Sequence, residues 1–102
     1  MEVHPLKPIQ DHDPGLFELV SREREFTFED GALPGRIKYL IAMALDAAHG
    51  TSAGVASLAR QALERGASKE EILETVRVAN FISGAGSVYT AAAGLGDILG
   101  AG

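Results

Sequence analysis

The feature that most constrains this fold is a pair of apolar helical patterns joined by a short break, between residues 34 and 66. The first pattern has helical i, i+3, i+4 and i+7 spacing, at Ile37, Leu40, Ile41, Ala44, Leu45 and Ala48. Gly50 fits the left-handed conformation that ends many helices, and Thr51 or Ser52 can cap a second helix that reaches about residue 65. This short connection predicts two helices lying side by side, with the rest of the chain packed around them.

The segment before this pair predicts an arm and one further helix. Residues 1–12 contain two prolines among polar residues and are expected to form an extended N-terminal arm that lies over a neighbour. Pro14 follows an aspartate that can cap a helix, so a helix is expected over residues 14–24. Phe26 and Phe28 are expected in an irregular link, with both rings buried.

Two more helices are expected after the central pair. Ser68 and Glu71 have the spacing of a capping box, in which each side chain accepts a hydrogen bond from the other residue's backbone N–H. This predicts a helix that continues to about residue 82. A glycine-rich turn at 83–86 precedes a last apolar helical pattern over residues 87–99.

Two glycines lie inside the last predicted helix. Gly94 and Gly96 each cost about 1 kcal/mol relative to alanine in helix propensity. They indicate either a frayed helix end or close packing against another helix or subunit. With about five helices, the chain is predicted to be an all-α, compact, oligomeric bundle around an antiparallel pair, with a helical domain over 13–102.

Composition excludes several classes of function. A net charge of −5 and a pI near 5.0 oppose binding to nucleic acid, which requires clustered Lys and Arg. The chain has no cysteine, which excludes disulfides, thiolate zinc sites and thiol redox catalysis. The beginning of the sequence lacks a signal-peptide pattern, and no uncharged apolar stretch reaches roughly 20 residues, so no membrane association and a cytoplasmic location are expected.

No cofactor or metal is predicted. Four residues near the beginning have the composition of metal ligands, but they lack the spacing of a zinc site: His4, Asp11, His12 and Asp13.

Candidate catalytic residues gather at the break. His49 as a base could polarise the hydroxyl of Thr51 or Ser52, with Tyr39 or Tyr89 as a proton donor. Two plainer explanations stay open: His49 bonded to backbone carbonyls at a helix end, and the two hydroxyls acting as caps.

Charged residues nearby add two further alternatives. Asp46 stands three residues before His49, so the two side chains could pair on one helix face. One of Arg60, Arg65 and Arg77 could hold a carboxylate substrate, although surface or inter-subunit positions explain them equally.

The order of several short motifs resembles the carboxymuconolactone decarboxylase family, which includes alkylhydroperoxidase D-like proteins. The pieces are Leu33-Pro34, basic residues at 36 and 38, Leu40-Ile41-Ala42, Arg60 to Leu63, Gly66-Ala67-Ser68, Glu70-Glu71-Ile72 and the turn from Ser83 to Gly86. The resemblance covers about residues 33–95. It implies an all-α bundle built around two antiparallel helices, assembled as a homotrimer or homohexamer.

The same resemblance implies a site whose usual residues are missing. The peroxidase-like branch has a Cys-x-x-Cys-x-x-x-His segment after the break and a Glu on the preceding helix. These positions fall on Thr51, Gly54, Leu58 and about Tyr39. The lactone decarboxylase branch has a histidine where Leu58 stands. Thiol peroxidase activity at this site is therefore excluded, because a hydroxyl cannot cycle through a disulfide.

Two hypotheses about function follow. In the first, the protein is an enzyme that acts on a small anionic or lactone-like metabolite, bound between helices near His49 and Thr51. In the second, it is a non-catalytic oligomeric scaffold or small-molecule binding protein that has lost the family active site. Its expected partners are other copies of itself and a small-molecule ligand.

Overall fold

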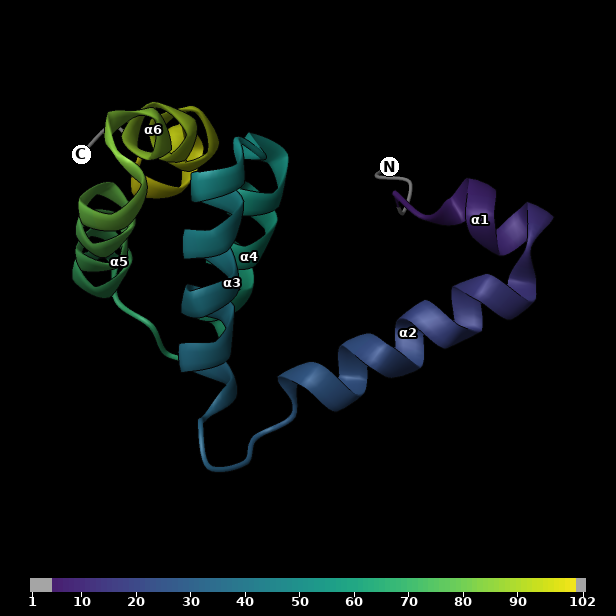
Figure 1. Cartoon of the computed structure of the whole chain (residues 1–102). Helices are drawn as coiled ribbons and strands as arrows, with labels where there is room; N and C mark the ends of the chain where they lie inside the picture. Colours follow the sequence, from purple (N-terminus) through teal and green to yellow (C-terminus); the bar gives the residue numbers. More distant parts are fainter. Residues whose placement is uncertain (1–4, 101–102) are drawn as a thin grey trace.

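The computed structural model describes residues 5–100, and all the regular structure in this range is α-helical (Figure 1). The helices are α1 (Lys7–His12), α2 (Pro14–Phe28), α3 (Gly35–His49), α4 (Ser52–Glu64), α5 (Lys69–Ser83) and α6 (Ala85–Leu99). The all-α prediction is thus confirmed, with six helices in place of about five. None of the helices in residues 5–100 is both long and apolar enough to cross a membrane.

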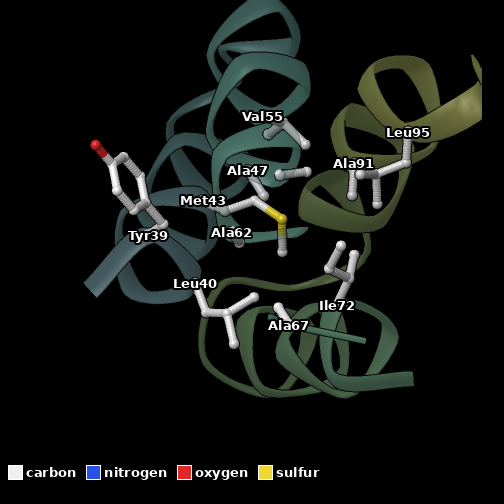
Figure 2. Packing of buried hydrophobic residues seen from close by; sticks show 11 residues of the cluster. Tyr39, Leu40, Met43, Ala47, Val55, Ala62, Ala67, Ile72, Ala91 and Leu95 are labelled. Atoms are coloured by element: carbon white, nitrogen blue, oxygen red, sulfur yellow. The ribbon is translucent and has the colours of Figure 1, made fainter. Parts of the chain in front are cut away.

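Helices α3 to α6 form a four-helix body around one apolar core. Helices α3 and α4 lie side by side and antiparallel, joined by Gly50 at φ 85° as predicted (Figure 1). The largest fully buried side chains are Met43, Val55, Ile72 and Leu95, one from each helix of the body (Figure 2). Many other core residues are alanines, which lets the helix backbones approach closely.

The capping box fixes the start of α5 and ties it to α3. The Glu71 backbone N–H donates to Ser68 Oγ at 3.0 Å, and the Ser68 backbone N–H donates to Glu71 Oε1 at 2.9 Å. Arg36, in the first turn of α3, donates to Glu71 Oε2. One carboxylate therefore caps a helix and binds the neighbouring helix.

Close packing explains Gly94, one of the two glycines that the sequence analysis noted near the end of α6. An ideal Cβ at Gly94 would lie 2.5 Å from the backbone O of Ser52 and 3.0 Å from the Val55 side chain. A Cβ at Gly96 would meet nothing within 4 Å. The backbones of α4 and α6 therefore touch at Gly94, whereas nothing in the structure explains Gly96.

The N-terminal region differs from the extended arm that was expected. Residues 7–12 form helix α1, with a proline in its first turn. Proline removes a backbone N–H, but the first turn of a helix does not need that donor, so Pro8 does not prevent the helix.

Helix α2 is longer than expected and continues to Phe28, without an irregular link at residues 25–28. The expectation that both rings are buried is wrong for Phe26, whose side chain is 76% exposed. Phe28 is half-buried, because its ring stacks on Tyr39 with centroids 4.1 Å apart. Helix α6 begins at Ala85, two residues earlier than expected, because the turn needs only Gly84 at φ 86°.

Helices α1 and α2, which we call the extension, project away from the body (Figure 1). Neither helix contains a buried residue. Besides the Phe28 stack, two hydrogen bonds hold the segment that joins α2 to α3, which we call the root of the extension. The Gly35 backbone N–H donates to Asp30 Oδ1 at 2.6 Å, and Lys38 Nζ donates to the Glu29 backbone O at 2.7 Å. The stack and both hydrogen bonds therefore attach the extension to the body at its C-terminal end.

Candidate functional site

The break between α3 and α4 carries three of the four predicted site residues. His49 ends α3 and Thr51 precedes α4, and both are exposed. Ser52, the first residue of α4, is half-buried and lines a small cavity of about 240 Å³ between α4 and α6. Thr51 occupies the N-cap position, but its side chain makes no capping hydrogen bond. The break thus exposes an imidazole beside a hydroxyl that the backbone does not use.

The fourth predicted residue, Tyr39, lies elsewhere. It precedes His49 by ten residues in α3, which places it roughly 15 Å away along the helix axis. Its side chain is only 2% exposed, stacked on Phe28 and covered by Arg65, whose Cζ lies 4.5 Å from the ring centroid. The structure therefore does not bring Tyr39 to the break, and gives it a packing role between the body and the extension.

The Asp46 carboxylate lies against the first turn of α4. An ideal Cβ at Gly54 would be 1.9 Å from Asp46 Oδ2, so the carboxylate occupies the space that a side chain at position 54 would need. The N-terminal end of a helix favours negative charge, which suits this position. Among the described residues Asp46 forms no ion pair with His49.

A larger space lies between the extension and α4, and we call it the hollow. Its volume is about 790 Å³, and its lining includes Arg24, Thr27 and Phe28 of α2 with Ser57 and Gln61 of α4. Arg24 Cζ lies 6.0 Å from the centroid of the Phe28 ring. The hollow thus combines a cation, an aromatic face and neutral hydrogen-bonding groups, and the carboxylate of Glu23 also belongs to its lining.

Sequence reasoning missed the hollow because its two walls are far apart in the chain. The only signal was the helical spacing of Arg24, Thr27 and Phe28, which marks one face of α2. No pattern in the sequence indicates that this face of α2 lies opposite α4.

The three arginines considered as carboxylate ligands have different surroundings. Arg65 covers Tyr39 and donates to the Gln61 backbone O at 3.3 Å. Arg60 lines the small cavity that includes Ser52, and Arg77 is exposed on α5. Of the three, Arg60 alone stands beside a residue of the break.

The described part of the chain contains no cluster of three or more His, Asp or Glu side chains that could hold a metal ion. His12, Asp11 and Asp13 are exposed at the junction of α1 and α2, and Asp13 caps α2 by accepting from Leu16 N at 3.1 Å. His4 lies outside the described residues.

Comparison with known proteins decides the family. The family model described as "Carboxymuconolactone decarboxylase family" matches residues 14–96. The chain belongs to the carboxymuconolactone decarboxylase family. No curated protein matches it.

A solved structure of the same family agrees with this fold. The crystal structure of apo-lpg0406, a carboxymuconolactone decarboxylase family protein from Legionella pneumophila, superposes with a TM-score of 0.83 at 31% sequence identity. The match covers 88% of this chain and 80% of that chain. The resemblance drawn from the sequence motifs is therefore confirmed.

Family membership allows the residues at the break to be compared with those of the peroxidase-like branch. The resemblance places the two cysteines of the peroxidase-like branch at Thr51 and Gly54, and its histidine at Leu58. In this member of the carboxymuconolactone decarboxylase family, Leu58 is half-buried against the core, and the Asp46 carboxylate occupies the space beside Gly54. Thr51, Gly54 and Leu58 carry neither a thiol nor an imidazole, so these three positions cannot perform the thiol redox chemistry of the peroxidase-like branch.

Proposed function

We propose that this member of the carboxymuconolactone decarboxylase family binds a small anionic or lactone-like molecule in the hollow between the extension and α4. The proposal joins the binding-protein alternative to the ligand class that the sequence analysis gave to the enzyme hypothesis, and it places the site in the hollow instead of at the break. The observation that carries it is the hollow itself, in which Arg24 and Phe28 lie beside each other in a space of about 790 Å³.

Size and chemistry both support this proposal. Small-molecule sites are usually concave spaces of about 300–1,000 Å³ with mostly apolar walls and a few polar groups. A guanidinium binds a carboxylate through two parallel hydrogen bonds, and the face of Phe28 offers a surface for a flat ring. The hydroxyls of Thr27 and Ser57 and the amide of Gln61 can bind carbonyl or ring oxygens.

The test is direct binding by calorimetry against a panel of small carboxylates and lactones. For a carboxylate that binds, Arg24→Ala should weaken affinity about tenfold or more, because a hydrogen bond to a charged group is lost. Arg77→Ala, which removes an exposed charge far from the hollow, is the matched control and should bind normally. Equal affinity for Arg24→Ala and the wild-type protein would show that the hollow is not the site.

A second candidate is the enzyme hypothesis at the break, favoured by the exposure of His49 beside an uncapped Thr51 hydroxyl. Here Ser52 is an alternative nucleophile, and Tyr39 would act only if it left its stack on Phe28. If this proposal holds, His49→Ala abolishes turnover of a lactone or carboxylate substrate found by metabolite screening. Unchanged turnover in His49→Ala would refute it.

Assembly and location stay predictions at this point. A homotrimer or homohexamer is expected from the family resemblance, and light scattering of the purified chain measures it. A cytoplasmic location is expected from the sequence alone, and imaging of the tagged full-length protein in its own cell checks it.

A further inference from the structure

We infer that helix α2 of one copy of this chain docks into the apolar groove between α3 and α5 of a second copy. The proposal concerns a specific contact between copies and does not depend on the proposed ligand. Three observations carry it: the excess surface of the chain, an uncovered stripe on α2, and a groove of matching length.

The chain exposes more surface than a compact monomer of its mass. Its accessible area is 6889 Å², whereas a 10.7 kDa monomer is expected to expose about 5,500 Å². Its Cα radius of gyration is 14.4 Å, against about 12.8 Å for a compact domain of 102 residues. The excess of roughly 1,400 Å² exceeds the ~800 Å² that each partner buries in a standard interface.

Part of the uncovered apolar area lies on one face of α2. Leu16, Leu19, Val20 and Phe26 follow helical spacing, and Leu19 is 59% exposed. They line one shallow concavity, whose lining also includes Arg22 and Glu23. We call these four residues the stripe. A single helix of 15 residues is only marginally stable in water, so α2 needs a surface against which to bury this stripe.

The body offers such a surface on α3 and α5. A groove of about 390 Å³ lies between these helices, lined by Ile37, Ile41, Ala44, Leu45, Thr75 and Val78. Leu45 is 55% exposed and Val78 64%. The walls are almost entirely carbon, so an occupant must itself be apolar.

The dimensions of the stripe and the groove agree. The stripe runs from Leu16 to Phe26, about 15 Å along α2, and the groove residues on α3 run from Ile37 to Leu45, about 12 Å. A groove between two helices accepts the side-chain ridge of a third at the usual helix spacing. The contact would thus bury both apolar surfaces at once.

The groove is out of reach of the chain's own stripe. Helix α2 leaves the body on the side of α3 opposite to α5, so it cannot fold back into the groove without breaking its attachment at residues 28–38 (Figure 1). Stripe and groove therefore match only between copies. Reciprocal exchange between two copies would also satisfy two-fold symmetry, because each gives one helix and receives one.

The absence of cysteine makes a clean cross-linking experiment possible. A tagged full-length Leu19→Cys variant is mixed with an untagged Leu45→Cys variant and treated with a short bis-maleimide. The proposal expects a cross-linked heterodimer of one tagged and one untagged chain. Glu64→Cys, exposed at the end of α4 and outside the groove, replaces Leu45→Cys as the matched control and should give at least several-fold less heterodimer.

Each other outcome overturns the proposal. Equal heterodimer yields with Leu45→Cys and Glu64→Cys would mean random collision. Homodimers of Leu19→Cys alone would mean that α2 pairs with α2. A single-chain mass by light scattering, with no heterodimer, would mean that another molecule or nothing covers the groove.

A second variant tests the energetics. Leu19→Asp should weaken self-association by about tenfold or more, because a buried leucine is replaced by a charge. Light scattering over a dilution series measures this, and circular dichroism checks that the helices persist. Self-association unchanged in a folded Leu19→Asp variant would refute the contact.

Discussion

Replacement of Gly94 by alanine tests whether α4 and α6 touch through their backbones. The added Cβ would lie 2.5 Å from the Ser52 backbone O, closer than real Cβ atoms approach, and 3.0 Å from Val55, tighter than most real contacts. Neither contact can be relieved by turning a flexible side chain, since one partner is backbone and the other is a β-branched core residue. The two helices must therefore move apart.

The expected magnitude is the difference between two opposing terms. Alanine gains about 1 kcal/mol over glycine in helix propensity. Overpacking a tight core costs typically 1–3 kcal/mol, and more where backbone must shift. We expect Gly94→Ala to lower the free energy of unfolding by up to about 2 kcal/mol. Gly96→Ala has nothing within 4 Å and should raise it by up to ~1 kcal/mol.

Urea unfolding followed by circular dichroism measures both variants beside the wild-type protein. For a domain of this size, a change of 1 kcal/mol in the free energy of unfolding also shifts the melting temperature by about 4–8 °C. A thermal melt therefore separates a stabilised variant from a destabilised one. Gly54→Ala is an internal check, because the clashing atoms belong to the Asp46 side chain, which can rotate away; its stability should change by less than about 1 kcal/mol. A stabilised Gly94→Ala would refute the close approach of α4 and α6.

Three further predictions concern the cap, its charge and the root of the extension. Ser68→Ala should lower the free energy of unfolding by about 1 kcal/mol in urea titrations, because the cap of α5 is lost. The hydrogen bond from the Ser68 backbone N–H, then the charge of Arg36, hold the pKa of Glu71 below its ordinary value of 4.5. This stabilisation is present above pH 4.5 and is lost as the pH falls through the lowered pKa, so the advantage of wild type over Glu71→Gln should shrink in acid unfolding curves; a constant advantage would contradict the cause. Phe28→Ala removes the stack on Tyr39 and should speed amide hydrogen exchange in α1 and α2 while leaving α5 protected; equal exchange in both would show that the stack does not hold the extension.

The body could be predicted from the sequence because its signals are local. The apolar spacing of α3 and α4, the left-handed Gly50 and the capping box at Ser68 each act within a few residues, and all of them appear as expected. Gly94 was open between a frayed end and close packing, and only the neighbouring helix decides it.

The extension and the site could not be predicted in the same way. The exposure of Phe26 and the burial of Tyr39 depend on the angle at which α2 leaves the body. Asp30 and Lys38 bond to backbone groups at the root of α2, and such bonds leave no periodic pattern in the sequence. The hollow arises from the same angle, so it too has no local signal.

A small rotation at the root of the extension produces a large displacement at the far end of α2. Helix α2 is about 22 Å long, so a rotation of ~10° at its attachment moves the far end by about 4 Å. Substitution of Asp30 or Lys38 would thus misalign distant surfaces without altering any residue on them. Exchange of a few polar residues at this attachment would therefore change how far α2 stands from α4, and with it the width of the hollow.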